Sequence, residues 1–352
     1  VGDMIDVGSL SHPAFTDVNA DGLMDMVVGN YGYYNLTGGT NASLYLFLNT
    51  GTPTHPAFEL TDRNWLNFAQ YAPNDYDFAP TFGDIDSDGD IDMLVGSNLG
   101  SLFCYINSAG TGQPLQLERN FDLMWLLMDV GQTSVPFIVD LDKDGLQDLL
   151  IGEKLGNVNF YKNTGIVGQP KFDAKPNIER LGAIDVRLQG ESLGHSTPVL
   201  IQGTDELLLV TGSAGGQLEV YRDISVSAQA FPALSERWGN NDEGSRTHPA
   251  FADLDNDGLL EMAVGNYRGG IALYKTQLKD CKVTSSGALT VQTPQLQIAP
   301  NPATHWVRVG LPKEGTARWR LINTTGQTVM EGVSEENAVV VHCPVSNLPT
   351  GI

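Results

Sequence analysis

Short apolar runs recur from residue 1 to about residue 276 and are separated by turns rich in Gly, Asn and Asp. One run, residues 24–28, follows an acidic loop, and another, residues 43–48, ends at an Asn-Thr-Gly turn. The latter recurs at residues 101–105, 157–161, 217–221 and 271–274. Apolar runs of this length, bounded by turn residues, are typical of β-strands. The pattern therefore predicts a series of short strands.

A longer repeated unit contains these runs. It spans residues 12–29 and returns at 79–96, 134–152 and 248–265, with a degenerate copy at 197–212. In the degenerate copy, Gln202-Gly203-Thr204-Asp205-Glu206 replaces the acidic loop. The glycines that close the units lie 53 to 67 residues apart. This period suits a four-stranded propeller blade and is long for most helical repeats.

We therefore predict an all-β fold, a β-propeller with five recognisable four-stranded blades. The segment Met4-Ile5-Asp6-Val7-Gly8 matches Met128-Asp129-Val130-Gly131, which has the place of the last strand of a blade. The chain thus starts inside a blade. Either the last blade borrows this first strand, or the five blades belong to a larger ring.

Four of the five units carry the loop pattern Asp-x-[Asp/Asn]-x-Asp-Gly-x-x-[Asp/Glu]. Calcium takes six to eight oxygen ligands, and short carboxylates at alternate loop positions supply them around one point. Positions 1, 3, 5 and 9 offer side-chain oxygens, and position 7 offers a backbone carbonyl. The candidate ligands are Asp17, Asn19, Asp21, Leu23 and Asp25; Asp84, Asp86, Asp88, Asp90 and Asp92; Asp140, Asp142, Asp144, Leu146 and Asp148; and Asp253, Asp255, Asp257, Leu259 and Glu261.

These loops differ from EF-hands at position 12, where an EF-hand has Glu. Here the position holds an apolar strand residue: Val28, Val95, Ile151 or Val264. We therefore predict four Ca²⁺ sites in loops between β-strands. Two carboxylates about 4 Å apart repel by about 4 kcal/mol at an effective dielectric of about 20, so the metal relieves a local repulsion. We expect the sites to be structural and not catalytic.

Charge divides the chain. The 352 residues include 42 acidic and 20 basic ones, and the net charge of −22 lies entirely in residues 1–283. Such an acidic chain repels phosphate backbones, which makes nucleic acid a poor candidate partner. We predict a propeller over residues 1–283, a linker over 284–296 and a second domain over 297–352. No run of 18 apolar residues occurs, so we expect no transmembrane segment.

The unit Phe-x-Asp-x-Asp-x-Asp-Gly-x-x-Asp, followed by three apolar residues and Gly, resembles the FG-GAP/VCBS repeat, which also forms the propeller of integrin α-chains. The resemblance extends from residue 1 to about residue 276. It implies a β-propeller with calcium in surface loops, in a secreted or surface-exposed protein. It implies no single activity, because members include adhesins, carbohydrate-binding proteins and polysaccharide lyases. The fourth unit departs from the motif, so no metal site is carried over to it.

The C-terminal segment carries a second resemblance. Ala299-Pro300-Asn301-Pro302 begins it, Asn323-Thr324-Thr325-Gly326 forms a turn, and Leu348-Pro349-Thr350-Gly351-Ile352 ends it. This arrangement is similar to the C-terminal sorting domain of the type IX secretion system, and it implies a truncated copy, since the usual final strand does not follow. The partner implied is the type IX secretion machinery. From the residues alone, alternating strands between turns indicate a small β-sandwich.

Aromatic residues mark two places in the propeller. Tyr31, Tyr33 and Tyr34 follow the Gly-Asn turn of the first unit, and Tyr267 holds the matching place in the last. These four are candidates for stacking on sugar rings, with packing between blades as the alternative. If five blades close a ring, the first and last blades are neighbours and their tyrosines converge. A second group, Trp65, Phe68, Tyr71, Tyr76 and Phe78, lies in the connection between the first two units.

Catalytic motifs are weak. Gly190-Glu191-Ser192-Leu193-Gly194 matches a nucleophile elbow, but that motif needs a helix after the turn and no helical pattern follows. His12, His55 and His248 each precede Pro-Ala-Phe and are interpreted as part of the repeat. Cys104, Cys281 and Cys343 form neither a disulfide framework nor a zinc site.

Three hypotheses of function follow. The first is a secreted or outer-membrane surface-attached propeller, stabilised by calcium, that binds glycans or protein partners. The second is a polysaccharide-active enzyme such as a lyase, which needs a base and a cationic group near an acidic sugar. The third is a non-catalytic spacer of a larger secreted enzyme. The shortage of basic residues in the propeller favours binding over catalysis.

Overall fold

The computed structural model describes residues 7–33, 41–128, 130–202, 206–235 and 244–279, together with five strands between residues 298 and 344. The chain divides into two compact units, Val1–Gly287 and Ala288–Ile352. Strands dominate both units. The helical elements within the described ranges are α1 (Leu123–Leu127) and the 3-10 turns η1 (Trp65–Gln70) and η2 (Leu181–Ala183). No helix in these ranges has the length and apolar character needed to cross a membrane.

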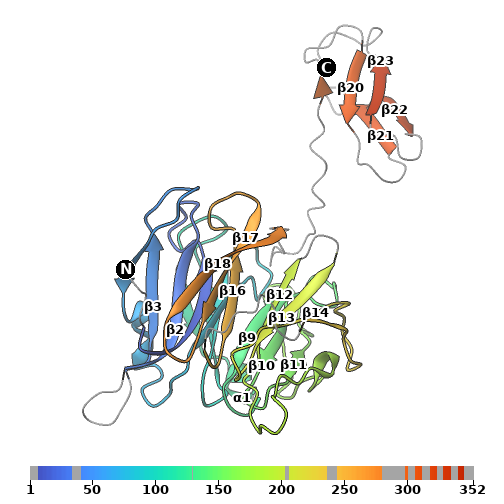
Figure 1. Cartoon of the computed structure of the whole chain (residues 1–352). Coiled ribbons are helices and arrows are strands. Elements are labelled where there is room, and N and C mark those ends of the chain that lie inside the picture. Colours follow the sequence, from blue (N-terminus) through green and yellow to red (C-terminus); the bar gives the residue numbers. More distant parts are fainter. Residues whose placement is uncertain are drawn as a thin grey trace. The chain divides into compact units, whose positions relative to one another are not determined.

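The first unit is an all-β propeller of five antiparallel blades (Figure 1). Blade one comprises β1 (Ser9–Thr16), β2 (Asp25–Gly32), β3 (Leu44–Asn49) and β4 (Phe58–Asp62). Blade two comprises β5 (Ala79–Gly83), β6 (Asp92–Gly96), β7 (Leu102–Asn107) and β8 (Leu117–Asn120). Blade three comprises β9 (Val135–Val139), β10 (Asp148–Gly152) and β11 (Val158–Tyr161), with a bridge between Phe160 and Ile178 on its outer side.

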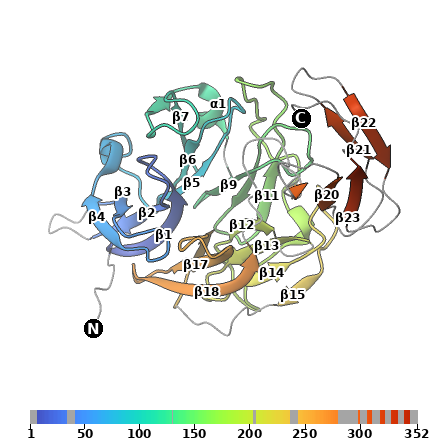
Figure 2. The same ribbon diagram turned by 90° about the horizontal axis from the view of Figure 1, so that it is seen from above.

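Blade four comprises β12 (Thr197–Gln202), β13 (Leu207–Gly212), β14 (Glu219–Tyr221) and β15 (Ala233–Ser235). Blade five comprises β16 (His248–Ala252), β17 (Leu259–Gly265) and β18 (Ile271–Lys279). The first strand of each blade contacts the first strands of the blades beside it, so these five strands surround the centre. Seen from above, the blades follow one another around that centre (Figure 2). The prediction of an all-β propeller with five blades is confirmed.

Neighbouring blades interlock through the glycine that ends each second strand. Each of these glycines lies so close to the backbone carbonyl of the next blade that a Cβ would overlap with its oxygen. The glycines are Gly29, Gly96, Gly152, Gly212 and Gly265, and the carbonyls belong to Phe78, Ser134, Ser196, Thr247 and Ser11. The repeated glycine, recognised in the sequence as the end of the unit, is therefore the place where one blade meets the next.

The ring closes between blade five and blade one. The Ser11 amide donates a hydrogen bond to the Asn266 carbonyl at 3.1 Å, just as the Ser134 amide donates to the Ser97 carbonyl at 2.9 Å between blades two and three. The Ser11 hydroxyl also donates to the Gly270 carbonyl at 2.8 Å. Of the two arrangements left open by the sequence, the five blades form a closed ring. The first six residues, which include part of the strand expected to be borrowed, lie outside the described residues.

The core lies between blades, where apolar faces of neighbouring sheets meet. Between blades one and two, Phe68 packs edge-on against Phe78 and Phe103, with ring centroids 4.7 and 5.4 Å apart. Trp65 belongs to the same buried cluster. These aromatic residues of the connection therefore pack between blades.

The second unit contains two small sheets. One has the strand order β19 (Ile298–Ala299), β20 (Trp306–Gly310), β23 (Val340–Pro344), and the other pairs β21 (Arg318–Ile322) with β22 (Thr328–Val333). All pairs are antiparallel. The turn at Asn323-Thr324-Thr325-Gly326 and the segments around Pro300 and Gly351 lie outside the described residues.

Candidate functional site

The acidic loops connect the first and second strands of blades one, two, three and five. In each, the carboxylate at position 9 opens the second strand or lies within it and fixes the loop to the blade. Asp92 accepts hydrogen bonds from the amides of Ile85 at 2.9 Å and Asn107 at 2.8 Å. Asp25 and Asp148 make the equivalent pairs of bonds, and Glu261 accepts from the Leu254 amide at 2.8 Å. The predicted ligand at position 9 thus has a structural role of its own.

The carboxylate at position 1 shapes the turn. Asp84 accepts hydrogen bonds from the amides of Asp88 and Gly89 at 2.9 and 3.0 Å, and Asp17 and Asp140 make the same contacts in their loops. The Gly at position 6 adopts a left-handed φ in all four loops, +100° at Gly89 and +83° at Gly258, a conformation that glycine takes without steric strain. Local bonds therefore hold the oxygens in place before any metal binds.

Three of the loops bring three carboxylates together. Within each group the ligand atoms lie within 4.8 Å of one another, and the groups are Asp84, Asp86 and Asp92; Asp140, Asp142 and Asp148; and Asp253, Asp255 and Glu261. Burial, the largest effect, raises the pKa of Asp92 to about 8 and that of Asp84 to about 6. Oδ1 of Asp253 and Oδ1 of Asp255 are buried without a hydrogen-bond partner. This oxygen-rich donor set, with unsatisfied oxygens, fits a hard cation such as Ca²⁺.

The loops of blades three and five hold a lysine among their carboxylates. Lys162 pairs with Asp142 and, at 2.9 Å, with Asp144. Lys275 pairs with Asp255 at 2.6 Å. These ammonium groups neutralise part of the negative charge of the two loops. In the loop of blade one, Asn19 replaces one carboxylate at position 3, and its Nδ2 donates to Asp21 at 2.9 Å.

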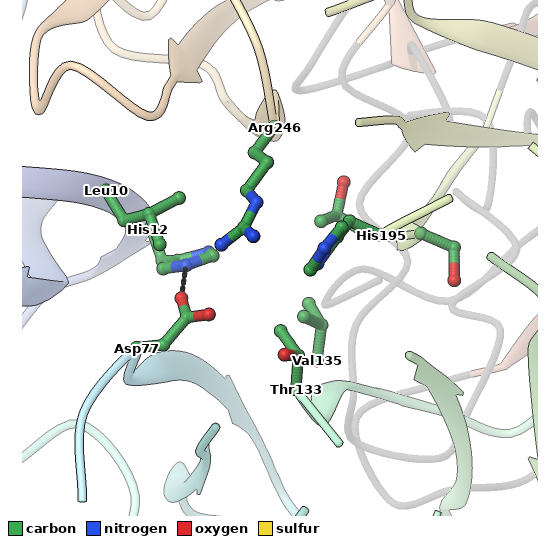
Figure 3. A pocket seen from close by; sticks show the side chains of 9 residues that line it. Leu10, His12, Asp77, Thr133, Val135, His195 and Arg246 are labelled. Atoms are coloured by element: carbon green, nitrogen blue, oxygen red, sulfur yellow. Dashed lines mark hydrogen bonds and ion pairs between the residues drawn. The ribbon is translucent and has the colours of Figure 1, made fainter. Parts of the chain in front are cut away.

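The other end of the innermost strands carries a different ring of residues. Each blade places one non-glycine residue with a left-handed φ at the start of its first strand or two residues before it, three positions before a proline. These residues are Leu10, Asp77, Thr133, His195 and Arg246, with φ between +50° and +60°. All five line one small pocket at the centre of the ring (Figure 3). Non-glycine residues in this conformation are strained, and such strain is concentrated at binding and catalytic sites.

A hydrogen-bonded chain of two histidines and one aspartate occupies one side of this pocket. His12 Nε2 donates to Asp77 Oδ1 at 2.6 Å, and the Nδ1 atoms of His12 and His248 lie 2.8 Å apart, at hydrogen-bond distance. Burial raises the pKa of Asp77, but the bond from His12 and the charges of His12 and Arg246 outweigh it and hold that pKa below its usual value. Burial lowers the pKa of His248 well below its usual value. Two of the three histidines interpreted as part of the repeat, His12 and His248, therefore meet at the centre of the ring, whereas His55 is exposed.

The opposite side of the pocket holds two side chains, His195 and Arg246, whose nitrogens have no hydrogen-bond acceptor among the described residues. His195 is 5% exposed, and neither of its ring nitrogens has a hydrogen-bond partner. Burial is the main reason why the pKa of His195 falls to about 4, and the charge of Arg246 adds to it. The Arg246 guanidinium lies 5.4 Å from the centroid of the Tyr267 ring and has no ion pair with a carboxylate of the described residues.

His195 and Arg246 also line a second, wider cavity of about 410 Å³. The small central pocket has about 10 Å³, room for about one water molecule. The wider cavity lies within the size range of small-ligand sites. Its other lining residues are Leu188, Glu191, Leu193, Ala214, Gly215, Ser245 and Tyr267. The His195–Arg246 pair therefore joins the centre of the ring to a cavity large enough for a ligand.

The tyrosines predicted to form one patch have different surroundings. Tyr267 lines the wide cavity and is 44% exposed. Tyr31 instead packs against Tyr76, with ring centroids 4.3 Å apart, because β2 continues through Gly32 and holds Tyr31 within the sheet. Tyr33 is 41% exposed and does not line the cavity, and Tyr34 lies outside the described residues.

The spacing of prolines in the sequence marks the central ring. Each of the five left-handed residues stands three positions before a proline: Pro13, Pro80, Pro136, Pro198 or Pro249. Proline lacks an amide hydrogen and is tolerated on edge strands, which is the position of the innermost strand in a blade. Aligning the units on this proline places the five residues in one column. The elbow-like segment at 190–194 leads into β12, a strand, so the helix that the elbow requires is absent there.

The buried histidines predict a loss of stability in acid. Free histidine titrates near pH 6.5, whereas the pKa of His195 in the folded chain is about 4. Between these values the unfolded chain binds a proton that the folded chain does not, so stability present above pH 6.5 is lost as the pH falls toward 4. The groups whose charges act on His195 are Arg246, Asp77, Lys154 and His12.

The corresponding test is urea unfolding between pH 7 and pH 4 at a fixed calcium concentration. His195→Asn should reduce the slope of stability against pH, because Asn accepts a left-handed φ and does not titrate. His55→Asn is the control, since His55 is exposed. Equal slopes in the parent chain and in His195→Asn would contradict the assignment.

Comparison with known proteins finds similarity over parts of the chain. A family model described as FG-GAP-like repeat matches residues 17–95. Integrin alpha-3 of Cricetulus griseus is 28% identical over 178 residues, which are 47% of this chain and 16% of that protein. Integrin alpha-6 of Homo sapiens is 24% identical over 201 residues, 54% of this chain and 16% of that protein. The chain thus spans a small fraction of the length of these relatives.

Among the solved structures that this chain matches is the catalytic domain of Coprinopsis cinerea GH62 alpha-L-arabinofuranosidase. It is 13% identical with a TM-score of 0.46, and the match covers 79% of this chain and 94% of that one. A structure titled "Glycoside hydrolase" is 9% identical with a TM-score of 0.44, over 96% and 92% of the two chains. At these TM-scores the two structures support no inference about this chain.

Proposed function

We propose that this chain is a calcium-stabilised β-propeller, secreted or attached to the outer-membrane surface, that acts as a binding module for glycans or protein partners. Calcium would be held by the four acidic loops, where it would balance carboxylates and keep each turn rigid. The oxygen-rich loops, their unsatisfied buried oxygens and the match to the FG-GAP-like repeat support this part of the proposal.

The cavity beside Tyr267 carries the binding proposal. The acidic loops follow the innermost strands, whereas the central ring and the cavity residues His195 and Arg246 precede them, so the two features lie at opposite ends of the same strands. Calcium at one face would therefore leave the other face free for a ligand. That face offers a cavity of about 410 Å³ with an exposed aromatic ring at Tyr267.

The C-terminal segment supports the proposed location. Residues 297–352 carry the Pro-Asn-Pro start and the Leu-Pro-Thr-Gly-Ile ending that resemble the type IX sorting domain. Antiparallel strands in this unit agree with a small β domain. We propose that this segment contacts the type IX secretion machinery.

Replacement of Tyr267 tests the binding site. With calcium present, Tyr267→Ala should bind glycans from an array about tenfold more weakly than the parent chain, because an aromatic contact of about 1.4 kcal/mol is lost. Tyr31→Ala is the matched control: it alters the equivalent Gly-Asn-Tyr segment but not the cavity. Thermal unfolding of both variants separates binding from packing. Reduced stability of Tyr267→Ala with unchanged binding would show that Tyr267 is a packing residue.

A further inference from the structure

The wide cavity contains two hydrogen-bond donors that nothing in the described protein satisfies. The Arg246 guanidinium contacts the Tyr267 ring but no carboxylate, although the chain has 42 acidic residues against 20 basic ones. The carboxylate beside it, Asp77, is already bonded to His12. His195 is almost fully buried with both ring nitrogens unpaired. Buried polar groups are normally paired, so His195 calls for a partner, and the half-buried Arg246 guanidinium lines the same cavity and can share an acceptor with it.

The two donors match a carboxylate. A guanidinium presents parallel N–H groups in the geometry of a carboxylate, and a neutral imidazole adds one further N–H donor. One cationic group balances one negative charge. A phosphate carries more charge and would need further cations, whereas the cavity also holds Glu191 and the chain has a net charge of −22. The balance of charge therefore favours a singly charged ligand.

The rest of the cavity suits a sugar ring. Tyr267 offers a partly exposed aromatic face, and Leu188 and Leu193 add apolar surface. Ser245 and Glu191 supply polar groups that can bond hydroxyls. The cavity thus combines apolar surface with convergent polar groups, both of which small-ligand sites use.

We infer that this cavity binds a saccharide that bears a carboxylate, such as a hexuronic acid unit, with its carboxylate on Arg246 and His195 and its ring against Tyr267. This inference rests on the proposed binding function and specifies its ligand class. Both donors come from the left-handed positions of the central ring, at φ +53° for Arg246 and +50° for His195. The interlocked blades hold these positions, so the donors are oriented before the ligand arrives.

Three ligands that differ at one carbon test the inference: methyl glucuronide, its uncharged amide and methyl glucoside. Titration followed by NMR, with calcium present and full-length chain, should show the glucuronide binding at least about tenfold more tightly than the other two. Arg246→Gln should remove that preference, and His195→Asn should reduce it. The control is Arg63→Gln, because Arg63 also lies over a tyrosine, Tyr45, at 5.5 Å but outside the cavity.

The outcomes separate the inference from the proposed function. Equal binding of all three sugars, lost in Tyr267→Ala, would leave glycan binding intact and overturn the acidic ligand. Binding of a Glu-rich peptide that depends on Arg246, with no sugar bound, would overturn the saccharide in favour of a protein partner. A preference that persists in Arg246→Gln, with the variant folded by its melting curve, would also overturn the assignment.

Discussion

Removal of calcium with excess EDTA should lower the melting temperature of the propeller markedly. A ligand that binds only the folded state stabilises it by about 2.7 kcal/mol when its concentration is 100 times the dissociation constant. Four loops carry the motif, and in three of them the carboxylate oxygens lie within 4.8 Å of one another. Without the metal, the repulsion between these carboxylates destabilises the folded state. Differential scanning calorimetry with and without EDTA, together with metal analysis of the purified protein, measures the effect.

The loop of blade two gives the sharpest version of this test, because no lysine pairs with its carboxylates in the described structure. Asp86→Asn should lower the melting temperature in calcium, where a ligand is lost. In EDTA the same change should leave it unchanged or raise it, because one repelling charge is gone. Glu59→Gln, in β4 and exposed, is the matched control for charge. Structural calcium sites would be excluded if the purified protein contained no metal and its melting temperature were the same in calcium and in EDTA.

The acidic loops and the blade repeat could be predicted because their structure depends on residues close together in the chain. The Asp84 carboxylate bonds to amides four and five positions away, and Asp92 bonds to the Ile85 amide seven positions away. A pattern of nine residues therefore contains most of the information for the turn. The closing glycine also occupies a fixed place in each unit, although its contact with the next blade is not evident from the unit alone.

The central site depends on contacts between residues distant in the chain. His12 bonds to Asp77, 65 positions away, and to His248, 236 positions away. His195 comes from blade four, and Arg246 comes from blade five, which also holds His248. These residues meet only because the ring closes. The repeat alone did not decide between a closed ring of five blades and a larger ring. The pairing of Tyr31 with Tyr76 was also hidden, since it depends on how far β2 continues beyond Gly29.

The contact between blades predicts a large effect of a single methyl group. In Gly96→Ala, the new Cβ would overlap with the carbonyl oxygen of Ser134 and lie 2.7 Å from Pro136 Cδ. Both neighbours are backbone or ring atoms that cannot rotate away, so the blades must separate. We expect a loss of about 3 kcal/mol or more in the free energy of unfolding, measured by urea titration at constant calcium. Gly270→Ala is the control, because its Cβ would meet only the side-chain nitrogen Nδ2 of Asn266, at 3.8 Å.

Gly265→Ala applies the same test to the closure of the ring. Its Cβ would overlap with the carbonyl of Ser11 and lie 2.8 Å from Pro13 Cδ, atoms of blade one. If blades five and one meet as blades two and three do, Gly265→Ala should destabilise the propeller as much as Gly96→Ala. An unchanged stability of Gly265→Ala, alongside a destabilised Gly96→Ala, would mean that the ring is open in solution. The central pocket would then lose its wall, since Leu10 and His12 on one side and Arg246 and His248 on the other would no longer be held together.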